Sequence, residues 1–135
     1  MNTPFGYTRE GNKGRVRLES QFLTQVTDCV AENGRCAAVV PGGLLNRTAA
    51  EDVELRKRFV EEFHVEQVIL LPISAFLPYA EVRTGIFIFA KEKGDGMTRF
   101  YDLRKVEPEK LKSLPEIYRK SGPVCTLNRT ILSQH

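Results

Sequence analysis

The chain has 135 residues, 41% hydrophobic and 27% charged, which suits one soluble domain with one core and excludes a disordered or fibrous chain. A formal net charge of +3, spread along the chain, permits a nucleic-acid partner without requiring one. Three cysteines without C-x-x-C spacing argue against disulfides or a metal site. The longest apolar run, residues 68–71, is too short to span a bilayer. We therefore expect a cytoplasmic protein.

The amino-terminal third of the chain predicts a loop, a helix and a buried strand. Residues 1–17 are rich in Gly, Thr, Asn and basic side chains without periodicity, which is typical of a loop. Across residues 18–33 apolar side chains recur at three- and four-residue steps, which predicts a helix that ends at Asn33-Gly34. The uncharged run at residues 36–40 then predicts a strand buried on both faces, as in a parallel sheet.

The middle of the chain predicts a helix and three strands. Thr48 and Glu51 have the spacing of a capping box, which predicts a helix over residues 49–63 with Val53 and Phe59 on its apolar side. Three strand-like runs follow, over residues 65–71, 85–90 and 98–103. The turn Gly94-Asp95-Gly96 predicts that the last two runs pair as a hairpin.

The end of the chain predicts less structure. Residues 107–121 indicate a weak helix that Pro115 interrupts, and residues 122–135 carry no clear pattern. We therefore expect a loop over residues 1–17, a partial α/β domain over 18–105, and a carboxyl-terminal helix and tail over 106–135.

The two buried strands joined through a helix predict a right-handed βαβ unit, so the expected fold class is α/β. The functional edge of such a sheet lies at the carboxyl ends of its strands, here Pro41-Gly42-Gly43 and Leu71-Pro72. Since no upstream residues supply the strands that normally precede the first helix, the sheet is expected to be cut beside residues 36–40. An open edge there predicts a homodimer, or cover by the amino-terminal loop or the carboxyl-terminal tail.

Single residues with reactive side chains have structural interpretations that we favour. Asp102 and Arg104 are expected to form an ion pair at a strand edge rather than a reactive pair. Cys36, in an Ala-Val strand without a basic neighbour, is expected to be an inert core residue. His64, at a junction of helix and strand, is expected to pack or cap rather than to act as a general base.

Several ordered segments of the chain together carry a family resemblance. They are Asn2-Thr3-Pro4-Phe5, the runs 34–45, 56–72 and 76–89, and finally residues 100–104. In this order and spacing they resemble the adenine-N6 DNA methyltransferase subunit of type I restriction-modification systems, over the carboxyl-terminal half of its catalytic domain. The resemblance implies a partial Rossmann-like sheet, a βαβ unit plus antiparallel strands, without the amino-terminal cofactor-binding half.

The resemblance also implies a catalytic role for the tetrapeptide, which is similar to the family's Asn-Pro-Pro-Phe. Such enzymes flip the target adenine out of the duplex, and Phe5 would stack on it. The side chain of Asn2 and a backbone carbonyl near Thr3 would accept hydrogen bonds from the adenine amine, which positions its lone pair toward the methyl donor. Thr3 stands where the family has its first proline, which implies a less rigid backbone before Pro4.

The family's cofactor, S-adenosylmethionine, binds at a glycine-rich turn upstream of the tetrapeptide. Among the 135 residues Gly42-Gly43 follows a later strand, and Gly94-Asp95-Gly96 is interpreted as a hairpin turn, so we expect no cofactor-binding residue in this chain. The resemblance implies DNA and a separate specificity subunit as partners of the intact protein. The chain alone is expected to be inactive.

Two alternatives to an inactive methyltransferase fragment stay open. The chain could be a non-enzymatic DNA- or protein-binding module, with Arg15, Arg17 and Arg47 as candidate phosphate contacts. It could also be a complementing half that needs a partner chain carrying the S-adenosylmethionine site.

Overall fold

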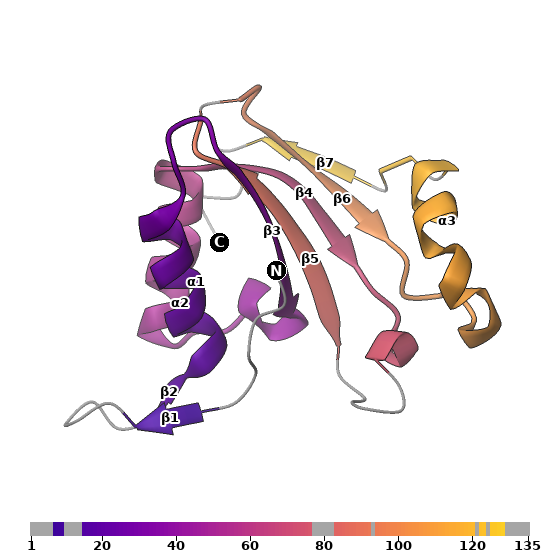
Figure 1. Cartoon of the computed structure of the whole chain (residues 1–135), viewed down its shortest axis with the longest axis horizontal. Helices are drawn as coiled ribbons and strands as arrows, with labels where there is room; N and C mark the ends of the chain where they lie inside the picture. The colour runs from indigo at the N-terminus through magenta and orange to yellow at the C-terminus, as the bar shows by residue number, and fades with distance from the viewer. Residues whose placement is uncertain are drawn as a thin grey trace.

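The structure is a computed structural model that describes residues 7–9, 15–76, 83–92, 94–120, 122–123 and 125–128 (Figure 1). Its strands are β1 (Tyr7–Arg9), β2 (Arg15–Arg17), β3 (Arg35–Pro41), β4 (His64–Leu70), β5 (Thr84–Ala90), β6 (Met97–Asp102) and β7 (Cys125–Asn128). Its α-helices are α1 (Leu18–Cys29), α2 (Ala50–Glu61) and α3 (Leu114–Lys120). Its 3-10 helices are η2 (Gly42–Leu45), η3 (Ile73–Phe76) and η4 (Pro108–Ser113).

A five-stranded sheet in the order β3-β5-β4-β6-β7 forms the centre of the domain. Strand β5 is antiparallel to both β3 and β4, β6 is parallel to β4, and β7 is antiparallel to β6. Strands β3, β4 and β6 therefore run in one direction. The predicted α/β class is confirmed, but β5 lies between the two parallel strands that α2 connects.

The predicted hairpin between β5 and β6 is wrong, because β6 pairs with β4. The connecting turn contains Gly94 and Gly96, both with positive φ. A Cβ atom on Gly94 would lie 2.2 Å from the His64 ring, so this turn packs directly on the first residue of β4. The turn thus lies against β4, the strand with which β6 pairs.

Two short strands occupy part of the predicted amino-terminal loop. Strands β1 and β2 pair in antiparallel register, with Tyr7 opposite Arg17. The loop prediction is therefore wrong for these residues, because their ladder depends on backbone hydrogen bonds and has no apolar period. The remaining residues up to 14, including the tetrapeptide Asn2-Thr3-Pro4-Phe5, lie outside the described residues.

Both long helices form where they were predicted, with different ends. Helix α1 stops at Cys29, and the chain turns through Asn33, whose φ is +61°. The predicted capping box is absent from α2: the N-cap is Ala49, which makes no side-chain hydrogen bond. The Ala49 carbonyl accepts from the Asp52 and Val53 amides, so the first turn closes on backbone atoms alone.

The core lies between the sheet and helices α1 and α2, which cover one face of it (Figure 1). Four phenylalanine rings meet edge to face there, Phe59, Phe63, Phe87 and Phe89. The buried side of α2 is Asp52, Leu55 and Phe59, whereas Val53 is 45% exposed. The prediction that Val53 lies on the apolar side is therefore wrong.

Helix α3 lies on the opposite face, beside β6 (Figure 1). The Tyr118 hydroxyl donates to Gln67 Oε1 of β4, and its ring lies edge to face 4.8 Å from that of Tyr101. Pro115 is the second residue of α3 instead of an interruption, because the first turn of a helix tolerates a residue without an N–H. Strand β7 lies in the tail for which the sequence predicted no element.

Strand β3 is the last strand of the described sheet, on the side where the sequence predicts an edge. Ala37 and Val39 of this strand take part in further interactions, so the strand is not without partners. Within the part of the chain that the structure describes, no helix is both long and apolar enough to cross a membrane.

Candidate functional site

The carboxyl ends of the three parallel strands meet at one edge of the sheet. The Gly42 amide, after β3, donates to the Arg83 carbonyl at 2.8 Å. The Leu71 amide, after β4, donates to the Thr84 carbonyl at 3.0 Å. The Leu103 amide, after β6, donates to the Leu70 carbonyl at 2.9 Å. Pro41-Gly42-Gly43 and Leu71-Pro72 therefore lie at the same edge, as the sequence predicts.

Thr84 stands at the middle of this carboxyl edge, opposite Pro41 of β3 and next to the Leu70 end of β4. It is only 2% exposed, and its hydroxyl oxygen has no hydrogen-bond partner among the described residues. A buried hydroxyl can both donate and accept. This position is thus a polar point in an otherwise apolar part of the sheet.

Beside the edge, Arg47 folds back over the turn that follows β3. A Cβ atom on Gly43 would lie 2.6 Å from Arg47 Nε, so glycine is what lets the guanidinium approach the backbone. Arg47 Nη1 donates to Glu19 Oε1 at 2.8 Å. Glu19 lies in the first turn of α1 and is 3% exposed, so this ion pair fastens η2 to the start of α1.

A second buried carboxylate connects the starts of the two helices. Asp52, in the first turn of α2, is fully buried and accepts a hydrogen bond of 2.5 Å from the Ser20 hydroxyl of α1. Its other oxygen lies 3.7 Å from Arg17 Nε. We call Arg17, Glu19, Ser20, Arg47 and Asp52 the polar cluster. Since an unpaired buried charge is costly, these partners fix how α1, α2 and η2 meet.

The third strand end carries the ion pair predicted from the sequence. Arg104 donates to the two oxygens of Asp102 from Nε at 2.8 Å and from Nη2 at 2.7 Å. These hydrogen bonds from Arg104, against a smaller opposing effect of burial, lower the pKa of Asp102 to about 2. A carboxylate held this firmly in its charged form is a poor proton carrier at neutral pH, which confirms the structural interpretation.

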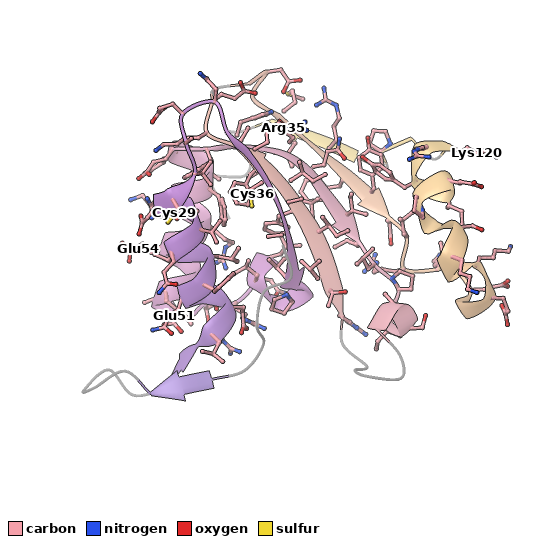
Figure 2. The ribbon with its side chains drawn as sticks, viewed as in Figure 1. Cys29, Arg35, Cys36, Glu51, Glu54 and Lys120 are labelled. Atoms are coloured by element: carbon pink, nitrogen blue, oxygen red, sulfur yellow. The ribbon has the colours of Figure 1, made fainter. Side chains whose placement is uncertain are left out.

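The other reactive side chains also have structural roles. Cys36, whose pKa is raised by burial, packs against the core on the helix-covered side of β3 (Figure 2). His64 is 7% exposed and lies at the start of β4, at the end of the sheet away from the carboxyl edge, with Nε2 3.4 Å from Asp95 Oδ1. The predicted packing roles of Cys36 and His64 are confirmed, while the lack of reactivity of the Cys36 thiol stays a prediction.

Two of the three arginines predicted to contact phosphate form ion pairs with buried acids. Arg17 and Arg47 both belong to the polar cluster, where each pairs with a buried carboxylate. Arg15 lies in β2, and its side chain is outside the described part. Sequence reasoning missed Glu19, Ser20 and Asp52. The available signal was the burial period of α2, in which Asp52 precedes Leu55 by three residues on the buried side.

Comparison with known proteins gives concordant results. The family model for N-6 DNA Methylase matches residues 6–119, from the residue before β1 into α3. The type I restriction enzyme EcoEI methylase subunit of Escherichia coli is 30% identical over 109 residues, which cover 75% of this chain and 22% of that protein. The chain therefore spans about a fifth of this curated relative.

Solved structures show the same fold. A chain from a type I R-M system superposes with a TM-score of 0.74 at 22% identity, covering 98% of this chain and 34% of that one. A protein from Listeria monocytogenes, ascribed to the class I S-adenosylmethionine-dependent methyltransferases, gives a TM-score of 0.62 at 18% identity, covering 88% of this chain and 40% of that one. The described elements thus form part of a Rossmann-like methyltransferase fold. Because the family match extends over well more than half of the chain, the protein belongs to the N-6 DNA methylase family.

Proposed function

We propose that this chain is the downstream part of the catalytic domain of a type I adenine-N6 DNA methyltransferase subunit, and that it does not transfer methyl groups by itself. One observation carries the proposal: the family match takes in every described strand except β7, while the chain covers only 22% of its E. coli relative. We place the activity in the cytoplasm, with the DNA substrate.

In this proposal the tetrapeptide before the matched residues holds the target base. Phe5 stacks on an adenine flipped out of the duplex, and Asn2 and the backbone at Thr3 accept hydrogen bonds from its amine. Pro4 restricts the backbone between them. The chemistry is positioning and electrostatic preorganisation, so the protein needs no general base. His64 and Asp102, whose structural roles are given above, are not required for it.

The methyl donor, S-adenosylmethionine, is bound in this proposal by residues outside the 135, either in the same polypeptide or in a partner chain. The carboxyl edge around Thr84 then faces the joined donor and base sites, as is usual for open α/β sheets. DNA and a specificity subunit are the proposed partners. The likeness to a chain of a type I R-M system supports this assignment.

The test is complementation. The chain is co-produced with the upstream part of the E. coli relative, and transfer of labelled methyl groups to adenine in DNA is measured. We expect activity from the pair, none from either part, loss of activity with Phe5→Ala, and substantial activity with Phe5→Tyr, since tyrosine also stacks. A stable pair without methylation, or Phe5→Ala with full activity, would contradict the proposal.

Calorimetric titration of the chain alone with S-adenosylmethionine tests where the donor site lies. We expect no saturable heat. Saturable binding at one site would mean that the chain holds an unrecognised donor site, and the inactive-fragment proposal would fail while the family assignment would stand.

A second candidate function, a DNA-binding module without catalysis, is favoured by Arg17 and Arg47, whose partners Asp52 and Glu19 lie in the first turns of α2 and α1. Their side chains pair with acids but stay 26% and 21% exposed, so a phosphate could still share each guanidinium. Together with Arg15 they would form a phosphate-contacting group. DNA affinity should then fall steeply with salt, and Arg47→Gln should reduce that slope by about one. Absence of binding at low salt would remove this candidate.

The homodimer through β3 that the sequence predicts is a separate proposal. Ala37 and Val39 already take part in further interactions, so a second copy would have to displace or extend them. Sedimentation equilibrium distinguishes the two cases directly, since a mass of about 15.3 kDa at all concentrations would exclude the dimer.

A further inference from the structure

A cavity of about 90 Å³ lies between α2 and the sheet. Its lining comes from α2, from Leu45 of η2, and from strands β4, β5 and β6. Among the described residues, neither Thr84 of the carboxyl edge nor any member of the polar cluster lines it. The cavity is thus separate from the catalytic machinery proposed above, and the inference does not depend on that proposal.

The cavity is apolar on its inner side. Phe59, Val68 and Phe87, which form its floor, are 2%, 2% and 5% exposed. Thr98 also lines the cavity, but its hydroxyl already donates to the Val65 carbonyl at 2.7 Å. The floor therefore offers van der Waals contact and no free hydrogen-bonding group, which favours an apolar ligand group.

One charged side chain, Arg56 of α2, lines the cavity. Its Nη1 donates to the Leu44 carbonyl at 2.9 Å, while its Nε is buried and has no hydrogen-bond partner in the described chain. None of the ion pairs formed among the described residues involves Arg56. By contrast, Arg58 of the same helix pairs with both Asp28 and Glu62.

Arg56 has no carboxylate partner among the described residues, and the cavity that it lines has no other free hydrogen-bonding group. A buried N–H of a charged group that lacks an acceptor is costly. A guanidinium offers two parallel N–H groups in a fork that matches a carboxylate. A ligand that places a carboxylate at Arg56 and an alkyl group over Phe59 and Phe87 would satisfy the guanidinium and fill the apolar cavity at the same time.

We infer that this cavity binds a small carboxylate that carries a short branched alkyl group. The size follows from the volume: a cavity of about 150 Å³ holds a benzene ring, so the volume here suits a group of about four carbons. The charge follows from Arg56. Nucleotides and phosphoesters with larger organic groups are too large for the hollow.

The test is a titration of isotopically labelled chain with 3-methylbutanoate, followed by amide shifts in two-dimensional NMR at constant ionic strength. The neutral 3-methylbutan-1-ol and the cationic 3-methylbutylamine have the same alkyl group and serve as matched ligands. We expect saturable shifts at Val60, Val68 and Phe87 with the carboxylate, binding about tenfold or more weaker with the alcohol, and none with the amine. No saturable shifts, or equal affinity for acid and alcohol, would overturn the inference.

Two variants test whether Arg56 contacts the carboxylate of the ligand. Arg56→Met keeps an apolar stem of similar width and removes the guanidinium, and Lys57→Met makes the same kind of change at a neighbour whose side chain is 70% exposed. We expect Arg56→Met to weaken the carboxylate about tenfold and leave the alcohol unchanged, while Lys57→Met alters neither. Unchanged carboxylate affinity in folded Arg56→Met would overturn the inference.

A third variant keeps the inference testable if Arg56→Met fails to fold. Val60→Phe fills the rim of the cavity from the same face of α2 without changing any charge. We expect it to abolish the binding of both acid and alcohol. Retention of 3-methylbutanoate binding by this variant would place the ligand elsewhere and contradict the proposed site.

Discussion

The two faces of the sheet are held to their helices in different ways. On the face covered by α1 and α2, four phenylalanine rings interlock around Phe59. On the other face, Tyr118 of α3 contacts the Tyr101 ring and donates a hydrogen bond to Gln67. The stability of the domain is therefore concentrated on the first face, because buried apolar area contributes far more than half-exposed polar and ring contacts.

The largest effect is expected at the centre of the first face. Phe59→Ala removes a side chain that is 2% exposed and leaves a cavity among three other rings, so we expect a loss of about 3–5 kcal/mol in the free energy of unfolding. Urea denaturation followed by far-UV circular dichroism measures it. The control is Val53→Ala on the same helix, 45% exposed, with an expected loss of less than about 0.5 kcal/mol. Similar losses in both variants would contradict the view that stability is concentrated in the aromatic core.

The next effect is expected where α1 and α2 begin. Asp52→Asn keeps the shape of the side chain but removes the charge that faces Arg17, and the Ser20 hydroxyl loses an ionised acceptor. We expect a loss of about 1–3 kcal/mol in the free energy of unfolding. Glu54→Gln is the control, since Glu54 points away from the sheet on the outer side of α2 (Figure 2).

A loss in Asp52→Asn no larger than that in Glu54→Gln would mean that the polar cluster does not fasten the helices. The first face would then depend on its phenylalanines alone. A loss close to that of Phe59→Ala would instead mean that the polar cluster and the aromatic core contribute comparably to the free energy of unfolding. The stability of the first face would then not depend mainly on its phenylalanines.

Secondary structure was largely predictable because its signals are local. The apolar periods of α1 and α2 and the strand-like runs of β3, β4 and β5 can be read over ten or fifteen residues. The carboxyl edge followed from the βαβ rule without knowledge of the neighbours. Strands β1 and β2 were missed since neither carries an apolar pattern.

Strand order and the polar cluster were not predictable from these signals. The position of β5 between β3 and β4 and the pairing of β6 with β4 are set by contacts between residues far apart in the sequence. Burial of Asp52 contradicts the usual preference of a charged residue for solvent. It becomes intelligible only when Ser20, more than thirty residues away, is known to be its partner.

A smaller effect is expected on the second face. Tyr118→Phe removes only the hydroxyl that donates to Gln67 and keeps the ring beside Tyr101, so we expect a loss of about 0.5–1.5 kcal/mol. The control is Lys120→Gln, an exposed change in the last turn of α3. Urea denaturation at neutral pH measures both. A loss as large as that of Phe59→Ala would mean that α3 contributes as much to stability as the aromatic core.

The smallest effect concerns the turn that leads from β6 toward α3, and it depends on pH. In the folded chain the pKa of Asp102 is about 2, against 3.8 for an ordinary aspartate, because Arg104 donates to both its oxygens. A lowered folded pKa means that the carboxylate stabilises the fold above pH about 4, and that this contribution disappears as the pH falls toward 2. The side chain is 26% exposed, so solvent screening limits the contribution to about 0–1 kcal/mol.

Urea denaturation of the wild type and of Asp102→Asn between pH 7 and pH 3 isolates the contribution of the Asp102 charge to the free energy of unfolding. We expect the wild type to be more stable at pH 7 by up to about 1 kcal/mol and the difference to shrink as the pH falls. Glu109→Gln, an exposed change in η4, should give no comparable trend. A difference that stays constant or grows toward low pH would show that the charge of Asp102 is not the source of the difference. The hydrogen bond from the Arg104 amide to Asp102 Oδ1, at 3.1 Å, would then be the contact that fixes the route to α3, because an asparagine oxygen can still accept it.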